Sequence, residues 1–389
     1  MDLFTPGTII NCNMFCVRLA MIDPRVEKLA DLLVNYSIEV KPGDTVAVNY
    51  FSGALPLAVE VYKKILAAGG HPLMQVSKNE FLEYLLRYGS DEQISYVHFP
   101  QRYITEKYDA TIHLLAEENT KSMTSIDPQK MVAFEKARTD LMETSMRRTA
   151  EGNFRWVLAI YPTNGYAQDA GMSLEEYTDF VYSACLPDMN DPVAFWKNLN
   201  ARQQKVVNWL KGKKQVHIKA KETDLRLSIE GRKFISCDGK LNMPDGEVFT
   251  GPVEDSAEGH VYFSYPAIES GREVTGIRLW FKKGKVVKAT AETNEDFLLK
   301  TLDTDPGARY LGEFAIGTSE GIQKFTKQIL FDEKIGGSFH LACGAGYPET
   351  GSINKSAVHW DMVCDLRDGG EIWVDGELLY KNGKFVIDY

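Results

Sequence analysis

Residues 44–76, "DTVAVNYFSGALPLAVEVYKKILAAGGHPLMQV", carry the pattern that decides the fold class of this 389-residue chain. The stretch begins with a run rich in β-branched residues (44–50), continues with a helix-like segment (54–68) and ends with a second strand-like run (71–76). Two glycines separate the helical segment from the second run, and glycine is common where a helix ends. A strand, a helix and a strand in succession are the unit from which parallel sheets are built. We therefore expect a parallel sheet covered by helices.

The same rhythm continues to about residue 212. A first amphipathic helix is predicted in "MIDPRVEKLADLLVNYS" (21–37). Further strand-like and helix-like segments follow: strands at 109–116 and 155–162, a long helix at 128–146 between them, and helices at 173–184 and 192–210. The turn after the first strand has no glycine-rich phosphate-binding motif, so nothing supports a nucleotide site. Residues 21–212 are predicted to form an α/β domain with a mostly parallel sheet, and residues 1–20 an extension before it.

The pattern changes after the lysine-rich segment "KGKKQ" (211–215). Beyond it, short runs of alternating apolar and polar residues are separated by turns such as "KKGK" and "KNGK", which are typical of hairpins. Residues 213–389 are therefore predicted to form a β-rich, largely antiparallel domain. The fold class expected for the whole chain is α/β plus α+β, and its length also favours two domains.

Composition excludes several classes of protein. The net charge of −10 argues against a binder of nucleic acid or of acidic membranes, whose charge balance is normally basic. No apolar run reaches the roughly 18 residues of a membrane span, and the first twenty residues lack the features of a secretory signal. Six scattered cysteines do not make a disulfide framework. We expect reduced thiols and a cytoplasmic protein.

The segment "SFHLACGAGYPETGSINKSAVHWDMV" (338–363) carries the clearest chemical pattern. His359 and Asp361 are separated by one residue in a strand-like run, so their side chains are expected on the same face, with Trp360 on the other. An imidazole beside a carboxylate is a suitable pair of ligands for a divalent cation. His340 lies in the same glycine-rich region. The pattern predicts a metal site, and a metal site of this kind predicts a hydrolase.

Two carboxylates further upstream are candidates for the same site. Glu247 follows a Pro-Asp-Gly turn, and Glu313 stands between Gly312 and Phe314 in an apolar stretch. Taken alone, Glu247 is also explained as an exposed turn residue, and Glu313 as an outward-facing or paired side chain. A buried carboxylate without a partner is too costly to keep ionised. The residues alone leave both interpretations open.

Four motifs resemble those of the thermophilic metallo-aminopeptidases, the family of aminopeptidase T, aminopeptidase S and PepS type. They occur in the family's order: "NMPDGEVFT", "GARYLGEFAIG", "FDEKIGGSFHLACGAGYPE" and "SAVHWDMV". The resemblance extends from about Met21 to the carboxy terminus, and residues 1–20 fall outside it.

The resemblance implies a site with two divalent metal ions in the β-rich domain. The implied metal ligands are Glu247, Glu313, His340, His359 and Asp361. Tyr347 corresponds to the family's active-site tyrosine. The ligand set is compatible with Zn²⁺, Co²⁺, Mn²⁺ or Mg²⁺, and the sequence does not choose among them. No general base is assigned, although Glu254 and Asp255 lie close to Glu247 in the sequence.

The activity implied is that of a cytoplasmic aminopeptidase, a homodimer that releases amino-terminal residues from peptides with a water activated by two metals. Two other classes stay open. One is a metal-dependent amidohydrolase acting on non-peptide amides, which the same ligands would serve. The other is a metal-binding protein without catalytic activity.

Overall fold

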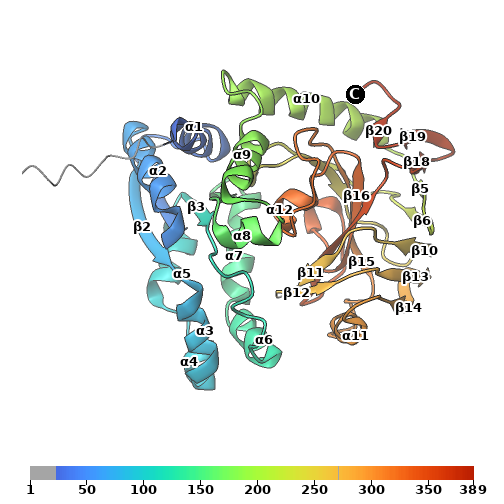
Figure 1. Ribbon diagram of the computed structural model, residues 1–389, viewed down its shortest axis with the longest axis horizontal. Coiled ribbons are helices and arrows are strands. Elements are labelled where there is room, and N and C mark those ends of the chain that lie inside the picture. The colour runs from blue at the N-terminus through green and yellow to red at the C-terminus, as the bar shows by residue number, and fades with distance from the viewer. Residues whose placement is uncertain (1–22, 270) are drawn as a thin grey trace, which may run out of the picture.

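The chain is described by a computed structural model over residues 23–269 and 271–389. The predicted extension, residues 1–20, lies outside the described residues. Figure 1 shows a helix-rich half, formed by the first part of the chain, beside a strand-rich half formed by the second part. Helix α10 (Pro192–Leu210) runs along the top of the molecule, from the helix-rich half to the strand-rich half.

The first half alternates strands and helices as expected. Its strands are β1 (Thr45–Phe51), β2 (His71–Ser77), β3 (Ala110–Leu115) and β4 (Arg155–Ile160). Its helices are α1 (Pro24–Leu32), a π-helical turn (Leu33–Ser37), a 3-10 turn (Ser52–Ala54), α2 (Leu55–Ala67), α3 (Asn79–Tyr88), α4 (Asp91–Ser95), α5 (Phe99–Lys107), α6 (Pro128–Lys136), α7 (Thr139–Ala150), α8 (Asn164–Asp169), α9 (Leu174–Cys185) and α10.

These strands form one parallel sheet in the order β2-β1-β3-β4, which confirms the predicted fold of this half. Strand β1 is an inner strand of this sheet, and its Val46 and Val48 are fully buried in the core of this half. Helix α2 ends where Gly69 takes a positive φ of 82°, a conformation open to glycine, and the chain then enters β2. The strand–helix–strand unit of residues 44–76 is thus present as its pattern predicted.

The long helix predicted over residues 128–146 is wrong, because the structure has two helices there, α6 and α7. The break falls at Arg138, whose ψ of 4° is not helical. Its guanidinium lies 3.5 Å from the ring centre of Phe134 and donates to the carbonyl oxygens of Phe134 and Tyr96. These contacts replace the helical continuation, and no apolar periodicity could have indicated them.

The second half is built largely from antiparallel strands, as predicted. Its strands are β5 (Gln215–Ala220), β6 (Thr223–Ser228), β7 (Ile235–Cys237), β8 (Asn242–Met243), β9 (Glu247–Thr250), β10 (Glu258–Tyr262), β11 (Ala267–Glu269), β12 (Arg272–Val274), β13 (Arg278–Lys282), β14 (Lys285–Thr290), β15 (Leu311–Gly317), β16 (Ser338–Gly344), β17 (His359–Asp365), β18 (Glu371–Val374), β19 (Glu377–Lys381) and β20 (Lys384–Phe385). Its helical segments are α11 (Glu295–Leu302), α12 (Ile329–Asp332) and a 3-10 turn (Pro348–Thr350).

Two of its sheets pack face to face. One has eight strands in the order β14-β13-β10-β6-β5-β18-β19-β20, and the other has five in the order β17-β16-β15-β9-β7. Buried residues of both sheets, among them Leu225 and Leu279 from the first and Phe314 and Met362 from the second, form a single core. The opposite face of the five-stranded sheet is therefore not part of this core.

The chain crosses between the halves more than once. Strand β8 pairs with β4 and so adds a fifth parallel strand to the first sheet. Phe331 of α12 and Ile335, shortly after this helix, are buried in the core of the α/β half. The division into residues 21–212 and 213–389 stays a prediction. None of the described helices is long and apolar enough to cross a membrane.

Candidate metal centre

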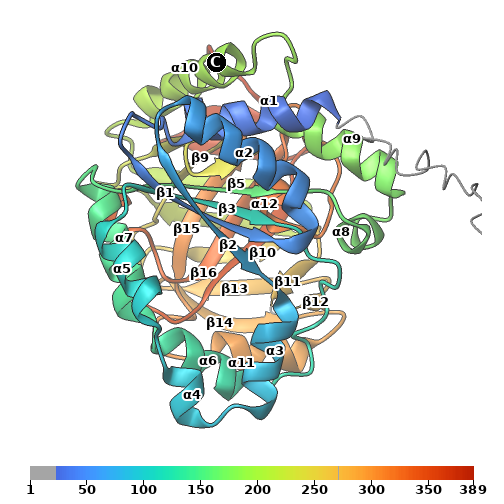
Figure 2. The same cartoon turned by 90° about the vertical axis from the view of Figure 1, so that its left-hand side faces the viewer.

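The candidate ligands share one face of the five-stranded sheet. Side chains alternate along each strand, and Phe314, Leu341 and Trp360 point into the core shared with the eight-stranded sheet. Their neighbours along the strands, Glu313 and His340 among them, therefore point to the opposite face. The position expected for Trp360 is confirmed, since it is 2% exposed within the core. Seen from the side of the α/β half in Figure 2, β15 and β16 lie behind the parallel strands, so this face is turned toward that half.

Strand register brings residues that are distant in the sequence into adjacent positions. Glu313 on β15 pairs with Ala342 on β16, which pairs in turn with Asp361 on β17. His340 pairs with Ala315, and His359 pairs with Gly344. Alanine and glycine between the ligands leave room above the sheet. The alternation of small and ligand side chains is what allows several ligands to converge.

Three of the predicted residues form a group at the open side of the site. His359 Nε2 lies 3.3 Å from Glu313 Oε2 and 3.5 Å from Asp361 Oδ2. One ligand atom from each residue lies within 4.8 Å of the others, which is the spacing of a metal site. The His359 side chain is 27% exposed. We call Glu313, His359 and Asp361 the open group.

A second group lies next to it, and its histidine is buried. It consists of Glu247, Glu333 and His340, whose ligand atoms again lie within 4.8 Å of one another. His340 Nε2 lies 3.3 Å from Glu247 Oε2, and the His340 side chain is 1% exposed. We call these three residues the closed group.

Glu313 lies between the two groups. Its Oε1 is 3.7 Å from His340 Nε2, while its Oε2 is 3.3 Å from His359 Nε2. Asp361 is placed in a similar way, with Oδ1 4.0 Å from His340 Nε2. A carboxylate with one oxygen toward each imidazole has the geometry needed to bridge two cations.

The electrostatics of the site reflect this crowding of buried acids and imidazoles. Burial alone would raise the pKa of Glu313, but the two imidazoles hold it at about 2. Burial would lower the pKa of His340, yet Glu313 and Glu247 raise it to about 9. In the same way, the neighbouring Asp361 and Glu313 raise the pKa of His359 to about 10 against the effect of burial. Burial raises the pKa of Asp361 to about 6.

Unpartnered buried atoms show that the donor set fits a cation. Among the described residues, Glu247 Oε2, Asp361 Oδ1 and both ring nitrogens of His340 are buried without a hydrogen-bond partner. Buried polar atoms normally have a hydrogen-bond partner, so atoms without one indicate a site for a ligand or ion. Carboxylate oxygens and an imidazole nitrogen that converge on one space are the ligands that Zn²⁺, Mn²⁺ or Co²⁺ take in proteins.

His359 is oriented by a contact outside the group. Its Nδ1 lies 2.8 Å from the carbonyl oxygen of Ala345, so Nδ1 donates and Nε2 is free to coordinate. Gly344, just before, has a φ of 108°, and a Cβ there would lie 2.0 Å from the carbonyl oxygen of Val358. Glycine at this position therefore lets the chain turn closely past the start of β17.

Tyr347 stands at the entrance of the open group. Its ring centre is 5.2 Å from that of His359 and 5.3 Å from that of Phe249. Burial and the nearby carboxylates, Glu313 foremost, raise its pKa well above the usual value. The phenol therefore stays protonated and is available as a hydrogen-bond donor.

Of the two acids left unassigned near Glu247, neither joins the site. Glu254 accepts hydrogen bonds from the backbone N–H of Ile353 at 2.8 Å and from Ser352 Oγ at 3.2 Å, and it forms an ion pair with Arg232. It therefore fixes the loop after Tyr347. Asp255 is exposed.

Two residues of the site were missed by the sequence patterns. Glu333 completes the closed group, and Lys334 places its Nζ 2.8 Å from Glu247 Oε1. Both belong to the motif "FDEKIGGSFHLACGAGYPE", in which an acid next to a lysine before two glycines was the available signal.

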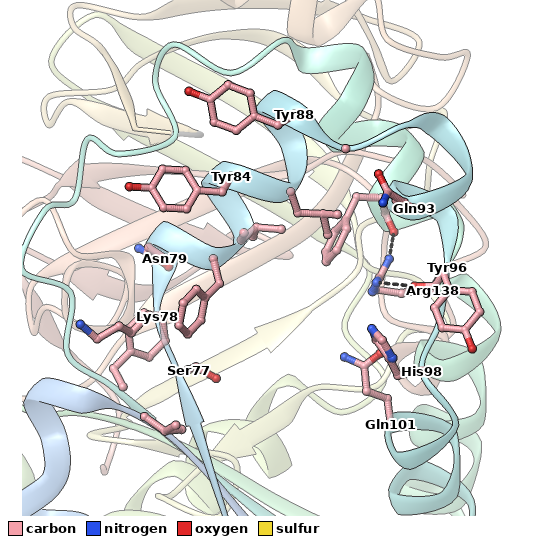
Figure 3. Close-up of a pocket in the computed structure, with 17 residues that line it drawn as sticks. Ser77, Lys78, Asn79, Tyr84, Tyr88, Gln93, Tyr96, His98, Gln101 and Arg138 are labelled. Atoms are coloured by element: carbon pink, nitrogen blue, oxygen red, sulfur yellow. Dashed lines mark hydrogen bonds between the residues drawn. The ribbon is translucent and has the colours of Figure 1, made fainter.

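A large cleft lies elsewhere, in the α/β half. Its volume is about 980 Å³, and its walls come from α3 to α6 and the end of β2. Figure 3 shows Tyr84 and Tyr88 on one side of it and Tyr96, His98 and Arg138 on the other. It contains no aspartate or glutamate and none of the candidate ligands, so it is separate from the metal centre.

Comparisons with known proteins place the chain in one family. Residues 22–385 match the family model described as thermophilic metalloprotease (M29). Aminopeptidase 2 of Geobacillus stearothermophilus is 27% identical and covers 94% of this chain and 98% of its own length. Aminopeptidase T of Thermus thermophilus is 29% identical over 69% of this chain and 74% of its own length.

A solved structure gives the same answer for the fold. Wild-type AmpT from Thermus thermophilus matches with a TM-score of 0.82 at 23% identity, covering 94% of this chain and 99% of that one. Members of the matching family are metal-dependent hydrolases of peptide bonds, and the grouped carboxylates and imidazoles described above could hold a metal ion. The chain belongs to the thermophilic metalloprotease (M29) family.

Proposed function

We propose that this chain is an aminopeptidase that releases amino-terminal residues from peptides with a water activated by two divalent cations. The observation that carries the proposal is the pair of ligand groups that share the space around Glu313, with buried atoms left unpartnered in both. Three relatives in sequence, named Aminopeptidase 2, Aminopeptidase T and Aminopeptidase PepS, support the same activity. The proposed ligands Glu247, Glu313, His340, His359 and Asp361 all lie within residues 213–389, which we propose as the catalytic domain.

The charge of the site supports two cations. Glu247, Glu313, Glu333 and Asp361 bring four carboxylates together, and Lys334 brings the single ammonium in contact with them. When the two imidazoles are neutral ligands, an excess of about three negative charges remains, which is too large to bury without compensation. Two divalent cations and one hydroxide would balance it. When bound, such cations would lower the pKa of a water and polarise the scissile carbonyl.

The protein's own groups have separate roles in this proposal. Glu313 directs one carboxylate oxygen toward each imidazole and so fixes the position of the open group relative to the closed group. His359 is held by the carbonyl of Ala345, so its Nε2 faces the site. Tyr347 donates a hydrogen bond from its Oη to the oxyanion that develops when the peptide carbonyl is attacked, a contribution of several kcal/mol at most.

The test is a hydrolysis assay with an aminoacyl-nitroanilide and with its amino-acetylated analogue. The metal-stripped protein should be inactive, and addition of Zn²⁺, Co²⁺ or Mn²⁺ should restore cleavage of the free-amine substrate alone. Cleavage of the acetylated substrate would indicate an amidohydrolase of another kind. Absence of cleavage with every metal and a panel of amino-terminal residues would contradict an enzymatic role.

A matched pair of variants distinguishes the loss of a metal ligand from the general effect of removing a histidine. His359→Ala should abolish hydrolysis, whereas His217→Ala should not. His217 also faces a carboxylate, Asp224, at 2.7 Å, but on the eight-stranded sheet. Equal activities of the two variants would contradict the proposed role of His359.

We further propose that the protein works as a homodimer in the cytoplasm. The four described cysteines are free, which supports a reducing compartment. The cleft of Figure 3 is bordered by exposed aromatic rings, with Phe81 66% and Tyr88 80% exposed, and a second copy would bury such a surface. Light scattering that shows only a monomer would contradict the dimer.

A further inference from the structure

Lys334 is a fully buried lysine within the candidate metal centre. It follows α12 directly, and its side chain is 0% exposed. Its Nζ lies 2.8 Å from Glu247 Oε1 and 3.9 Å from Asp245 Oδ1, and it also contacts Glu333 Oε1. Two of these three carboxylates belong to the closed group.

The open group has no such partner. Glu313 and Asp361 form ion pairs with the imidazoles of His340 and His359. Among the described residues, Lys334 is the one lysine or arginine paired with a member of either group. A fixed positive charge therefore stands on one side of the site.

The contact with Glu247 also determines which way that carboxylate points. Lys334 occupies Oε1, which leaves Oε2 directed toward His340 Nε2 at 3.3 Å and without a hydrogen bond. Side chains that orient a ligand in this manner commonly tune the metal it holds. Lys334 is thus placed to act on a cation through the ligands of the closed group.

We propose that Lys334 makes the two groups unequal, so that the open group binds a divalent cation tightly and the closed group binds the second one weakly. The inference rests on the proposed two-cation function. Its physical basis is Coulomb repulsion between the ammonium and a cation held by the same carboxylates, which is screened poorly in a buried site. Orientation of Glu247 favours binding, but the repulsion of a divalent charge is the larger effect. The expected difference between the two affinities is at least about tenfold.

The wild-type protein tests this directly. Metal-free protein is titrated with Co²⁺ by calorimetry, and bound cobalt is counted after equilibrium dialysis and followed by its absorption spectrum. Two separate binding steps are expected, with one cation retained at low free Co²⁺ and the second one lost. Two equal steps would overturn the inference. Absence of any bound cobalt would contradict the proposed function instead.

Removal of the charge provides the second arm. In Lys334→Met the weaker step should tighten at least about tenfold, while the stronger step should change much less. Lys334→Gln removes the charge but keeps a donor, and it should behave in the same way. A weak step that is unchanged or weakened in both variants would overturn the inference, and so would equal tightening of both steps. Thermal unfolding of the metal-free variants identifies any that fail to fold, and the wild-type titration then decides alone.

Lys327→Met is the matched control. Lys327 lies on the segment just before α12, and its Nζ pairs with Glu273 at 2.7 Å, away from both groups. Its replacement removes the same charge and should leave both binding steps unchanged. A tightening equal to that of Lys334→Met would assign the effect to net charge and overturn the role of Lys334.

Discussion

The open group and the closed group lie on the same face of one sheet but differ in access and charge. His359 is 27% exposed, and Tyr347 stands beside it, whereas His340 is 1% exposed and has Lys334 on the far side of its partner Glu247. Under the proposed function, we therefore expect a substrate carbonyl to reach the site at the open group. The closed group, which contacts the ammonium of Lys334, is better suited to an electrostatic role than to contact with the substrate. Two groups with similar ligand types thus differ in their exposure to solvent and in their contact with a buried lysine.

The largest effect is expected from Asp361→Asn in the open group. The amide keeps the shape of the side chain but loses the negative charge that the cation and His359 require. We expect kcat/KM to fall at least about 1,000-fold, equivalent to about 4 kcal/mol, because the Lewis-acid contribution is of this size. Steady-state kinetics with an aminoacyl-nitroanilide measures it. A loss of less than tenfold would remove the open group from the chemistry.

A somewhat smaller effect is expected from Tyr347→Phe. Loss of the phenol removes a donor to the oxyanion, which should lower kcat about 100- to 1,000-fold with little change in KM. Metal content should stay unchanged, because the ring contacts with His359 and Phe249 persist. Metal analysis beside the kinetics distinguishes the roles. Loss of bound metal in the variant would show that Tyr347 acts as a ligand.

Glu333→Gln tests the closed group and should have a weaker effect. Glu247 and His340 remain, and Lys334 keeps its partner Glu247. We expect roughly a 10- to 100-fold loss of activity at limiting metal, the range typical for altered support of a metal site. Excess Co²⁺ should recover most of it. The activity of Glu333→Gln could instead fall as far as that of Asp361→Asn and not recover with excess metal. This result would contradict a functional difference between the two groups.

The sequence predicted the open group better than the closed one for a physical reason. His359 and Asp361 are neighbours by strand alternation alone, a local rule that needs no knowledge of the fold. The bridging position of Glu313 depends on pairing with β16 and became an expectation through the family motifs. Lys334 reaches a partner 87 positions away in the chain, from a turn that has no periodic pattern. Contacts of this kind are fixed by tertiary structure.

The same limit applies to the fold. The strand–helix–strand unit of residues 44–76 was readable because its patterns are local, and its sheet is present as predicted. The pairing of β8 with β4 was not, since it joins two residues of a β-rich segment to a parallel sheet. The split between α6 and α7 was hidden as well, because the contacts of Arg138 with Phe134 and Tyr96 replace a helical turn.

The smallest effect we expect is a dependence of metal-free stability on pH, which arises from the two imidazoles. In the folded protein the pKa of His340 is about 9 and that of His359 about 10, both above the ordinary value of 6.5. A raised pKa means that the folded state holds the proton more tightly. This contribution is fully present below about pH 6.5 and is lost as the pH rises through 9 and 10. We expect this loss to appear as a fall in the Tm of the metal-free protein between pH 6.5 and 10.

The metal-loaded protein provides the comparison for this last prediction. Its imidazoles are already deprotonated by coordination, so its Tm should change less between pH 6.5 and 10. Thermal unfolding of both forms across this range measures the difference. His340→Gln should remove the part of the loss centred near pH 9, and His359→Gln the part near pH 10. A metal-free protein that gains stability with rising pH would mean that the imidazoles are neutral in the folded state, and the two groups would then differ in access alone.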